Sequence, residues 1–177
     1  MSQADRDRLG KLMKTRTGSG APAISPAKHA GVWLPPPLIY LAVFVLALFL
    51  QAHWRLPAIP EILSGAGGPV LIAAGVLLSA WSIGFFRRAR TSLIPMKPTT
   101  ALVIAGPYRF TRNPMYLSLV IVYLGAALLF QILWAVLLTP LVVLAVQFGV
   151  VRKEERYLHE KFGEDFSRYQ ASVRRWI

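Results

Sequence analysis

An uncharged stretch of 39 residues, 113–151, most constrains what this chain can fold into. It contains no Asp, Glu, Lys or Arg, and most of its side chains are apolar. One membrane-spanning helix needs about 20 apolar residues, so the stretch is too long for one crossing and about right for two short ones. Two crossings return the chain to the side from which it entered. The segments that flank the stretch are therefore predicted to meet at one membrane surface.

Composition favours a single membrane domain. The chain has 177 residues, of which 55% are hydrophobic and 16% charged. This balance is atypical of a soluble domain. The net charge of +12 could suggest nucleic acid, but the basic residues flank apolar segments, where membrane topology and anionic lipid explain them more simply. We predict no nucleic-acid partner. With no cysteine and three scattered histidines, we also predict no metal site.

The predicted fold is all-α: an integral membrane bundle of about four transmembrane helices with an amphipathic C-terminal helix in the cytosol. Residues 1–30 are basic and rich in Ser, Gly, Pro and Ala, which predicts a flexible tail. Residues 31–177 are predicted to form one domain. Its spans are predicted at about 37–53, 69–86, 115–130 and 133–151, and its cytosolic helix at 152–169.

Three local patterns refine this fold. Small residues in the second span (Gly75, Ser79, Ala80 and Gly84) predict close approach of a neighbouring helix. Pro140 predicts a kink in the fourth span. An apolar stripe predicts one helix that lies on the membrane surface or packs back on the second loop; its members are Leu158, Phe162, Phe166, Tyr169 and Val173.

The positive charges predict the orientation. The loop after the first span holds only Arg55, and the loop after the third span holds no basic residue. The loop after the second span is rich in them: Arg87, Arg88, Arg90, Lys97, Arg109 and Arg112. Because basic residues accumulate on the cytosolic side, both termini are predicted to be cytosolic. The predicted location is the bacterial inner membrane.

Two charged segments at this surface form a candidate site. Asn113 and Pro114 suit a helix start, where free N–H groups favour an anion such as a carboxylate. Arg109 and Arg112 precede it, and two adjacent glutamates, 154 and 155, supply the opposite sign. A ligand with both an ammonium and a carboxylate would match these poles, and tyrosines 108 and 116 could stack on its ring. The alternative is that these charges only set topology or form a solvated charge run.

The motifs carry a family resemblance. GPYRFTRNPMY at 106–116, followed by the apolar hairpin and then EERYLHEKFGEDFSRY at 154–169, resembles the isoprenylcysteine carboxyl methyltransferase and phospholipid methyltransferase family. The family hallmark R-H-P-x-Y-x-G is matched by Arg112, Pro114 and Tyr116, with Asn113 in place of the histidine and Ser118 in place of the glycine. The resemblance covers roughly residues 91–176.

The resemblance implies S-adenosyl-L-methionine (SAM) as cofactor. Carried over position by position, it implies these cofactor-binding residues: Thr100, Leu102, Val103, Tyr108, Arg112, Asn113, Pro114, Tyr116 and Glu155. The catalytic candidates are Arg112, within the hallmark, and Glu154, which could take a proton from an amine acceptor. The match of Phe162–Asp165 and Tyr169 to the family's tail implies a structural lid.

The predicted function is methyl transfer from SAM to a lipophilic acceptor, either an isoprenylcysteine-like carboxylate or a phospholipid amine. Membrane lipid and a lipid-linked substrate are the expected partners. Two alternatives stay open. The first is an NADPH-dependent membrane reductase, since some sterol reductases resemble this family's C-terminal half. The second is a non-enzymatic membrane scaffold.

Overall fold

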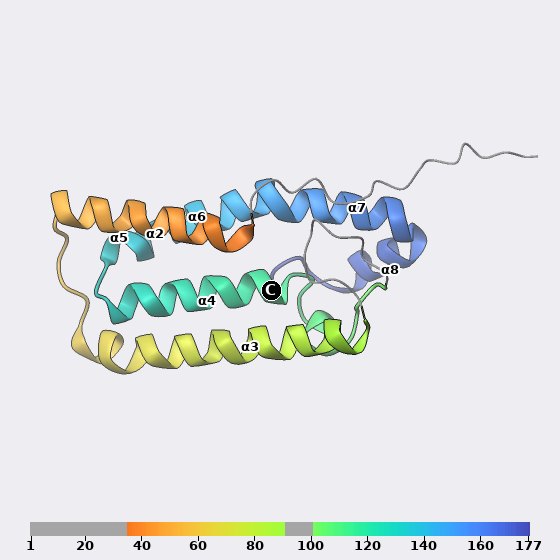
Figure 1. The fold of residues 1–177 in the computed structure, drawn as a ribbon, viewed down its shortest axis with the longest axis horizontal. Helices are drawn as coiled ribbons and strands as arrows, with labels where there is room; N and C mark the ends of the chain where they lie inside the picture. Colours follow the sequence, from red (N-terminus) through yellow and green to blue (C-terminus); the bar gives the residue numbers. More distant parts are fainter. Residues whose placement is uncertain (1–34, 91–100) are drawn as a thin grey trace, which may run out of the picture.

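The computed structural model describes residues 35–90 and 101–177, and all the regular structure in these ranges is helical. The helical segments lie side by side along the long axis, and successive segments run in opposite directions (Figure 1). In chain order they are α2 (Pro36–His53), α3 (Gly68–Arg88), α4 (Pro114–Leu129), and α5 (Leu133–Leu137) with α6 (Thr139–Val146). The all-α prediction is confirmed for this part of the chain. The predicted tail, 1–30, lies outside it.

Two of the described helices have the length and composition to cross a membrane. They are Pro36–His53, with a mean hydropathy of 1.8, and Leu63–Arg88, with 1.9. Only 17% and 11% of their most apolar windows are buried in the protein. Helices with so much exposed apolar surface suit a lipid environment rather than a soluble core. Pro114–Leu129 is shorter, with 16 residues, and the next segment is interrupted at Leu138. The structure therefore has two clear spanning helices where four were predicted.

The second span begins earlier than predicted. Helical structure starts at Glu61, within the expected loop, and passes through η1 (Leu63–Gly67), a π-helical turn, before α3. A proline inside a helix lacks an N–H and crowds the carbonyl four residues earlier. The π-helical turn ends at Gly67, two residues before Pro69, and its wider spacing allows the helix to continue past this proline.

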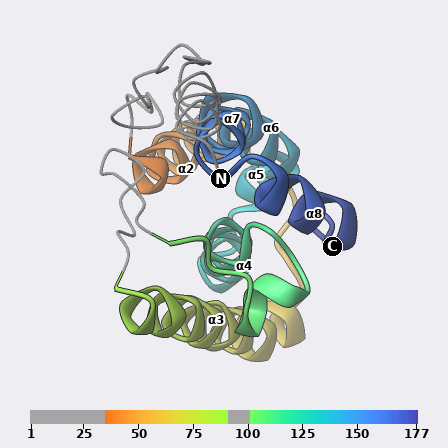
Figure 2. The same ribbon diagram turned by 90° about the vertical axis from the view of Figure 1, so that its right-hand side faces the viewer.

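Close packing of α3 on α4 holds the bundle together. Seen from the end of the bundle, α4 is central, with α3 on one side and α2 and α6 on the other (Figure 2). A Cβ at Gly75 would lie 2.8 Å from the Ser118 carbonyl oxygen, and one at Gly125 would lie 2.8 Å from the Gly68 carbonyl oxygen. The prediction of close approach is confirmed at Gly75. It is wrong at Gly84, where a Cβ would meet nothing within 4 Å.

This difference predicts opposite effects for two identical substitutions in α3. Gly75→Ala forces an added methyl group against the α4 backbone, and overpacking of this kind costs about 1–3 kcal/mol. Gly84→Ala adds the same group in open space and is expected to be neutral or stabilising by up to about 1 kcal/mol, since alanine favours helix. Thermal unfolding of both variants in detergent tests this. Equal midpoints would show that the two helices separate easily.

The predicted helical hairpin is present. α4 ends at Leu129 and α5 begins at Leu133. Between them Gln131 adopts a positive φ of 55°, and the Ile132 N–H donates to the Ala127 carbonyl at 2.8 Å. The predicted kink is also present: the helix is interrupted at Leu138, two residues before Pro140.

The chain then extends beyond the bundle. From Thr139 the helix continues through η3 (Gln147–Val151), a π-helical turn, into α7 (Arg152–Phe162). Figure 1 shows α7 projecting past the end of the neighbouring α4. A second helix, α8 (Glu164–Ser172), folds back from the tip of α7.

The single helix predicted at 152–169 is wrong. Gly163 has a φ of 51° and a ψ of −120°, so it ends α7 and turns the chain into α8. The apolar stripe is nevertheless brought together across the two helices. Phe166 and Tyr169 are buried against Tyr108, and the rest of the stripe is partly buried in the same cluster. Since this cluster includes Tyr108, Leu102 and Val103, the stripe packs back on the second loop.

Candidate functional site

Polar groups gather at one end of the bundle. The loop 101–113, which includes η2 (Gly106–Arg109), meets α7, α8 and the 173–177 segment there (Figures 1 and 2). Gly106 allows this loop to pass close to α3, because its φ is +62° and a Cβ would lie 2.4 Å from the Phe85 ring. The two charged segments singled out in the sequence therefore meet at one end of the structure.

The start of α4 binds backbone carbonyls of the 173–177 segment. The Arg112 N–H donates to the Arg174 carbonyl at 3.0 Å. Thr111 Oγ1 and Asn113 Nδ2 both donate to the Arg175 carbonyl, at 3.1 and 2.9 Å. Asn113 directly precedes the helix, as predicted, but its side chain makes no capping hydrogen bond. It faces the 173–177 segment instead.

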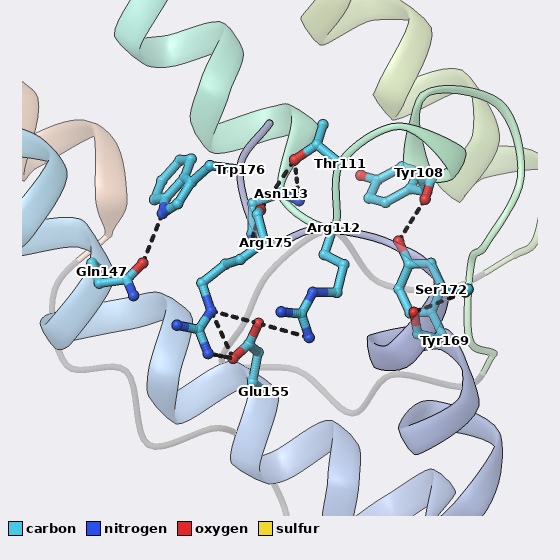
Figure 3. A network of polar contacts seen from close by, with 10 residues as sticks. All are labelled: Tyr108, Thr111, Arg112, Asn113, Gln147, Glu155, Tyr169, Ser172, Arg175 and Trp176. Atoms are coloured by element: carbon cyan, nitrogen blue, oxygen red, sulfur yellow. Dashed lines mark hydrogen bonds and ion pairs between the residues drawn. The ribbon is translucent and has the colours of Figure 1, made fainter.

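An ion-pair cluster lies beside these donors. Figure 3 shows the Glu155 carboxylate facing the guanidinium groups of Arg175 and Arg112. Arg175 binds with two nitrogens, Nη2 to Oε2 at 2.6 Å and Nε to Oε1 at 3.0 Å, and Arg112 Nη1 lies 3.4 Å from Oε1. The hydrogen bonds to Glu155 raise the pKa of Arg175, which keeps the guanidinium charged. The side chains of Arg112 and Glu155 are only 12% and 11% exposed, so this is a largely desolvated pair.

Glu154 faces a different partner. The Tyr116 hydroxyl, in the first turn of α4, donates to Glu154 Oε2 at 2.8 Å. The Tyr116 carbonyl accepts from the Tyr40 hydroxyl of α2 at 3.0 Å, which ties three helices together. Burial raises the pKa of the Glu154 carboxyl above its ordinary value; the Tyr116 hydrogen bond opposes this shift, and the Glu155 charge adds to it. Glu154 is thus poised to hold a proton more readily than an exposed glutamate.

The raised pKa predicts a pH-dependent effect of Glu154→Gln on stability. The folded protein binds the Glu154 proton more tightly than the unfolded chain does, so this group stabilises the fold at pH below its unfolded value. The contribution is lost as pH rises through the raised folded value. The thermal unfolding midpoint of the wild type should therefore fall relative to that of Glu154→Gln as the pH rises. The fall should lie between the unfolded pKa, about 4.3, and the raised pKa of Glu154 in the folded protein. Glu160→Gln, an exposed change on the same helix, should show no such trend.

Aromatic residues lie on the α8 side of this end of the bundle. The Tyr169 hydroxyl of α8 donates to the Tyr108 carbonyl at 2.7 Å, and the Tyr108 ring lies 5.3 Å from the Phe86 ring of α3. Burial raises the pKa of both tyrosines, so both stay neutral. In Figure 3, Arg112 lies between Glu155 and this tyrosine pair.

A broad open cavity of about 930 Å³ lies between the loop and α8. It is lined by Leu102, Ile104, Arg109, Phe162, Asp165, Arg168, Tyr169, Ser172 and Val173. Small-molecule sites commonly have volumes of about 300–1,000 Å³, mostly apolar walls and a few polar groups. This cavity has that character, and Tyr169, one of its lining residues, donates to the Tyr108 carbonyl.

The predicted site residues divide into three groups. The structure brings together Arg112, Asn113, Tyr116, Glu154 and Glu155, and Pro114, next to Asn113 in the chain, is fully buried. Leu102, Val103 and Tyr108 lie in the aromatic cluster on the α8 side. Thr100 lies outside the described residues. Arg109 is exposed at the cavity and does not join the ion-pair cluster.

Sequence reasoning missed Thr111 and Arg175, which contribute hydrogen bonds and an ion pair at this end of the bundle. A charge argument could have pointed to Arg175, because a buried glutamate needs a cationic partner and Arg174 and Arg175 form a basic pair. Thr111 carries no comparable signal. In the described ranges no group of three or more His, Cys, Asp or Glu side chains suits a metal ion.

The fold and site define a class: an all-helical membrane protein with a polar, charge-paired site at one end of its apolar helices. Its family follows from the sequence. The family model for phospholipid methyltransferases matches residues 63–165, more than half of the chain, and the chain therefore belongs to this family. The predicted resemblance is confirmed, and membership implies a membrane methyltransferase. The matched range contains Tyr108, Arg112 and both glutamates but not Arg175.

One similar protein matches about a third of this chain. An uncharacterized protein of Haemophilus influenzae is 36% identical over 63 residues, which make up 36% of this chain and the whole of that protein. No solved structure matches.

Proposed function

We propose that this protein is an integral membrane methyltransferase that uses SAM to methylate a lipophilic acceptor. The observation that carries the proposal is the Arg112–Glu155 pair, with opposite charges 3.4 Å apart, beside the Thr111 and Asn113 donors at the start of α4. One cation and one anion at this spacing match the carboxylate and ammonium of an amino-acid group. The family match supplies the reaction class.

The residues present fit this cofactor. Glu155 would bind its ammonium and Arg112 its carboxylate, with donors from Thr111 and Asn113. Arg112 Nε is buried and has no hydrogen-bond partner within the described residues, so the guanidinium retains an unused donor. The cavity beside Leu102 and Tyr169 would take the nucleoside. Four of the predicted binding residues take part in these assignments: Leu102, Arg112, Asn113 and Glu155.

When bound, SAM supplies a methyl group on a sulfonium, an electrophile that transfers in line to a nucleophile. The protein then mainly needs to position the acceptor, and positioning alone contributes strongly to such reactions. An amine acceptor must also lose a proton, and Glu154 is the catalytic base we assign. Its raised pKa suits proton acceptance, and its hydrogen bond from Tyr116 fixes its orientation. A carboxylate acceptor needs no base.

The acceptor is proposed to be lipophilic because the site lies at the end of apolar helices whose surfaces face outward. A phospholipid amine and an isoprenylcysteine-like carboxylate both fit this placement. Incubation of purified protein and native lipid extract with methyl-labelled SAM, followed by mass spectrometry, tests the proposal. A labelled lipid is expected. Absence of any labelled product, with the protein folded and native lipids present, would contradict it.

The proposed topology has four crossings, with α4 and the α5–α6 run as the third and fourth. This arrangement places the site on the cytosolic side with both termini. Because the chain has no cysteine, a single introduced cysteine reports its own accessibility. In spheroplasts, a membrane-impermeant thiol reagent should label Glu61→Cys and spare Arg168→Cys, both of which are exposed positions. The reverse pattern would contradict the cytosolic placement of the site.

A further inference from the structure

The 173–177 segment makes contacts that resemble those of a bound amino acid. The Arg175 carbonyl accepts hydrogen bonds from Thr111 Oγ1 and Asn113 Nδ2, while its guanidinium binds the Glu155 carboxylate (Figure 3). One residue thus presents an acceptor to the donors at the start of α4 and a cation to the acid of α7. These are the two poles that the proposed cofactor would present.

The charges of the ion-pair cluster also support the comparison of Arg175 with a bound amino acid. With Arg175 in place, two guanidinium groups face one carboxylate, so the cluster carries an excess positive charge. An additional ammonium would then meet net repulsion. If Arg175 leaves, Arg112 and Glu155 provide one cation and one anion, which complement a zwitterion. The carboxylate of the ligand would replace the peptide carbonyls, and its ammonium would replace the guanidinium.

The segment is held by contacts that can be exchanged. Arg175 is 33% exposed at its side chain, and Trp176 Nε1 donates to Gln147 Oε1 at 2.8 Å. The Val173 N–H donates to the Tyr169 carbonyl at the end of α8. Residues 174–177 can therefore move while α8 stays in place. Val173 stays with α8, and residues 174–177 are the part that would leave the site.

We propose that the 173–177 segment is an internal competitor of the cofactor, with Arg175 occupying the position of the cofactor's amino-acid group. This inference rests on the proposed function. Ligand binding requires the segment to leave Glu155, so the measured affinity is reduced by the fraction of molecules in which the segment has left. A segment in place in about 90–99% of molecules weakens binding about 10- to 100-fold.

Arg175→Ala tests the competition. Calorimetry with S-adenosylhomocysteine, the demethylated product of the cofactor, should show binding about tenfold or more tighter than in the wild type. Arg174→Ala is the matched control, because its side chain is exposed while its backbone carbonyl stays in place. Its affinity should remain within about twofold of the wild type. The gain from Arg175→Ala should disappear in a Glu155→Gln background, where there is no carboxylate to release.

A second readout follows the segment in the wild type. Saturating S-adenosylhomocysteine should increase trypsin cleavage after Arg175 by about 10- to 100-fold, because proteolysis tracks the open population. Slower cleavage, or unchanged or weaker binding by Arg175→Ala, would overturn the inference and make the segment a cover that closes over the cofactor. In that case the wild type still binds, and the proposed function stands. No binding by any folded variant would overturn both.

Discussion

Glu155→Gln, introduced together with Arg175→Ala, is expected to lower the affinity for S-adenosylhomocysteine by about 10- to 100-fold relative to Arg175→Ala alone. The change keeps the shape of the side chain and removes its charge. A hydrogen bond to a charged group is worth about 1.5–3 kcal/mol, which converts to this range of affinity. The Arg175→Ala background matters because Glu155 otherwise binds Arg175 as well. In the wild type, Glu155→Gln would weaken binding of the ligand and would also release the competing Arg175, so the two effects would oppose each other.

The control for this prediction is Glu160→Gln, an exposed carboxylate on α7. Its affinity should equal that of its parent. The thermal midpoint of each variant must be measured alongside, since removing Glu155 leaves the Arg112 guanidinium, 12% exposed, without its anion. Unchanged affinity in a stable Glu155→Gln variant would show that Glu155 only anchors the 173–177 segment.

Phe166→Ala is expected to destabilise the docking of α8 by about 3–5 kcal/mol, the usual effect of deleting a buried phenyl ring. Phe166 is 1% exposed and lies in the cluster with Tyr108 and Tyr169. Without the ring, α8 loses its main attachment to the loop that precedes α4. Hydrogen exchange across α8 and thermal unfolding in detergent would measure the loss.

Phe110→Ala is the matched control for Phe166, because it removes the same ring from a 72% exposed position. It should change stability by less than about 0.5 kcal/mol. Phe166→Leu retains much of the buried volume and should recover most of the loss. If Phe166→Ala leaves the exchange of α8 unchanged, α8 is held by the Tyr169–Tyr108 hydrogen bond instead.

Much of the fold follows from local sequence. The uncharged stretch 113–151 determines the helical hairpin, because an apolar chain of that length can satisfy its backbone only as helices in a bilayer. The helix start at Pro114 and the interruption near Pro140 follow from a residue that lacks an N–H. The meeting of the hallmark with the two glutamates follows from the even number of segments between them.

Other features depended on tertiary contacts. Gly75 and Gly84 look alike in the sequence, and only the position of α4 decides that one is packed and the other free. The sequence around Gly163 does not show whether this glycine lies inside one helix or ends it. Its turn is stabilised because α8 can then bury Phe166 against the loop.

The two glutamates differ for the same reason. Residues 154 and 155 are adjacent, so their sequence environment is nearly identical, but the α7 helix points them about 100° apart. Glu154 reaches Tyr116, and Glu155 reaches Arg112 and Arg175. The sequence by itself determined that acids and arginines meet at one end of a membrane bundle. The tertiary structure alone decided which acid binds which partner, because that choice depends on the rotation of one helix against another.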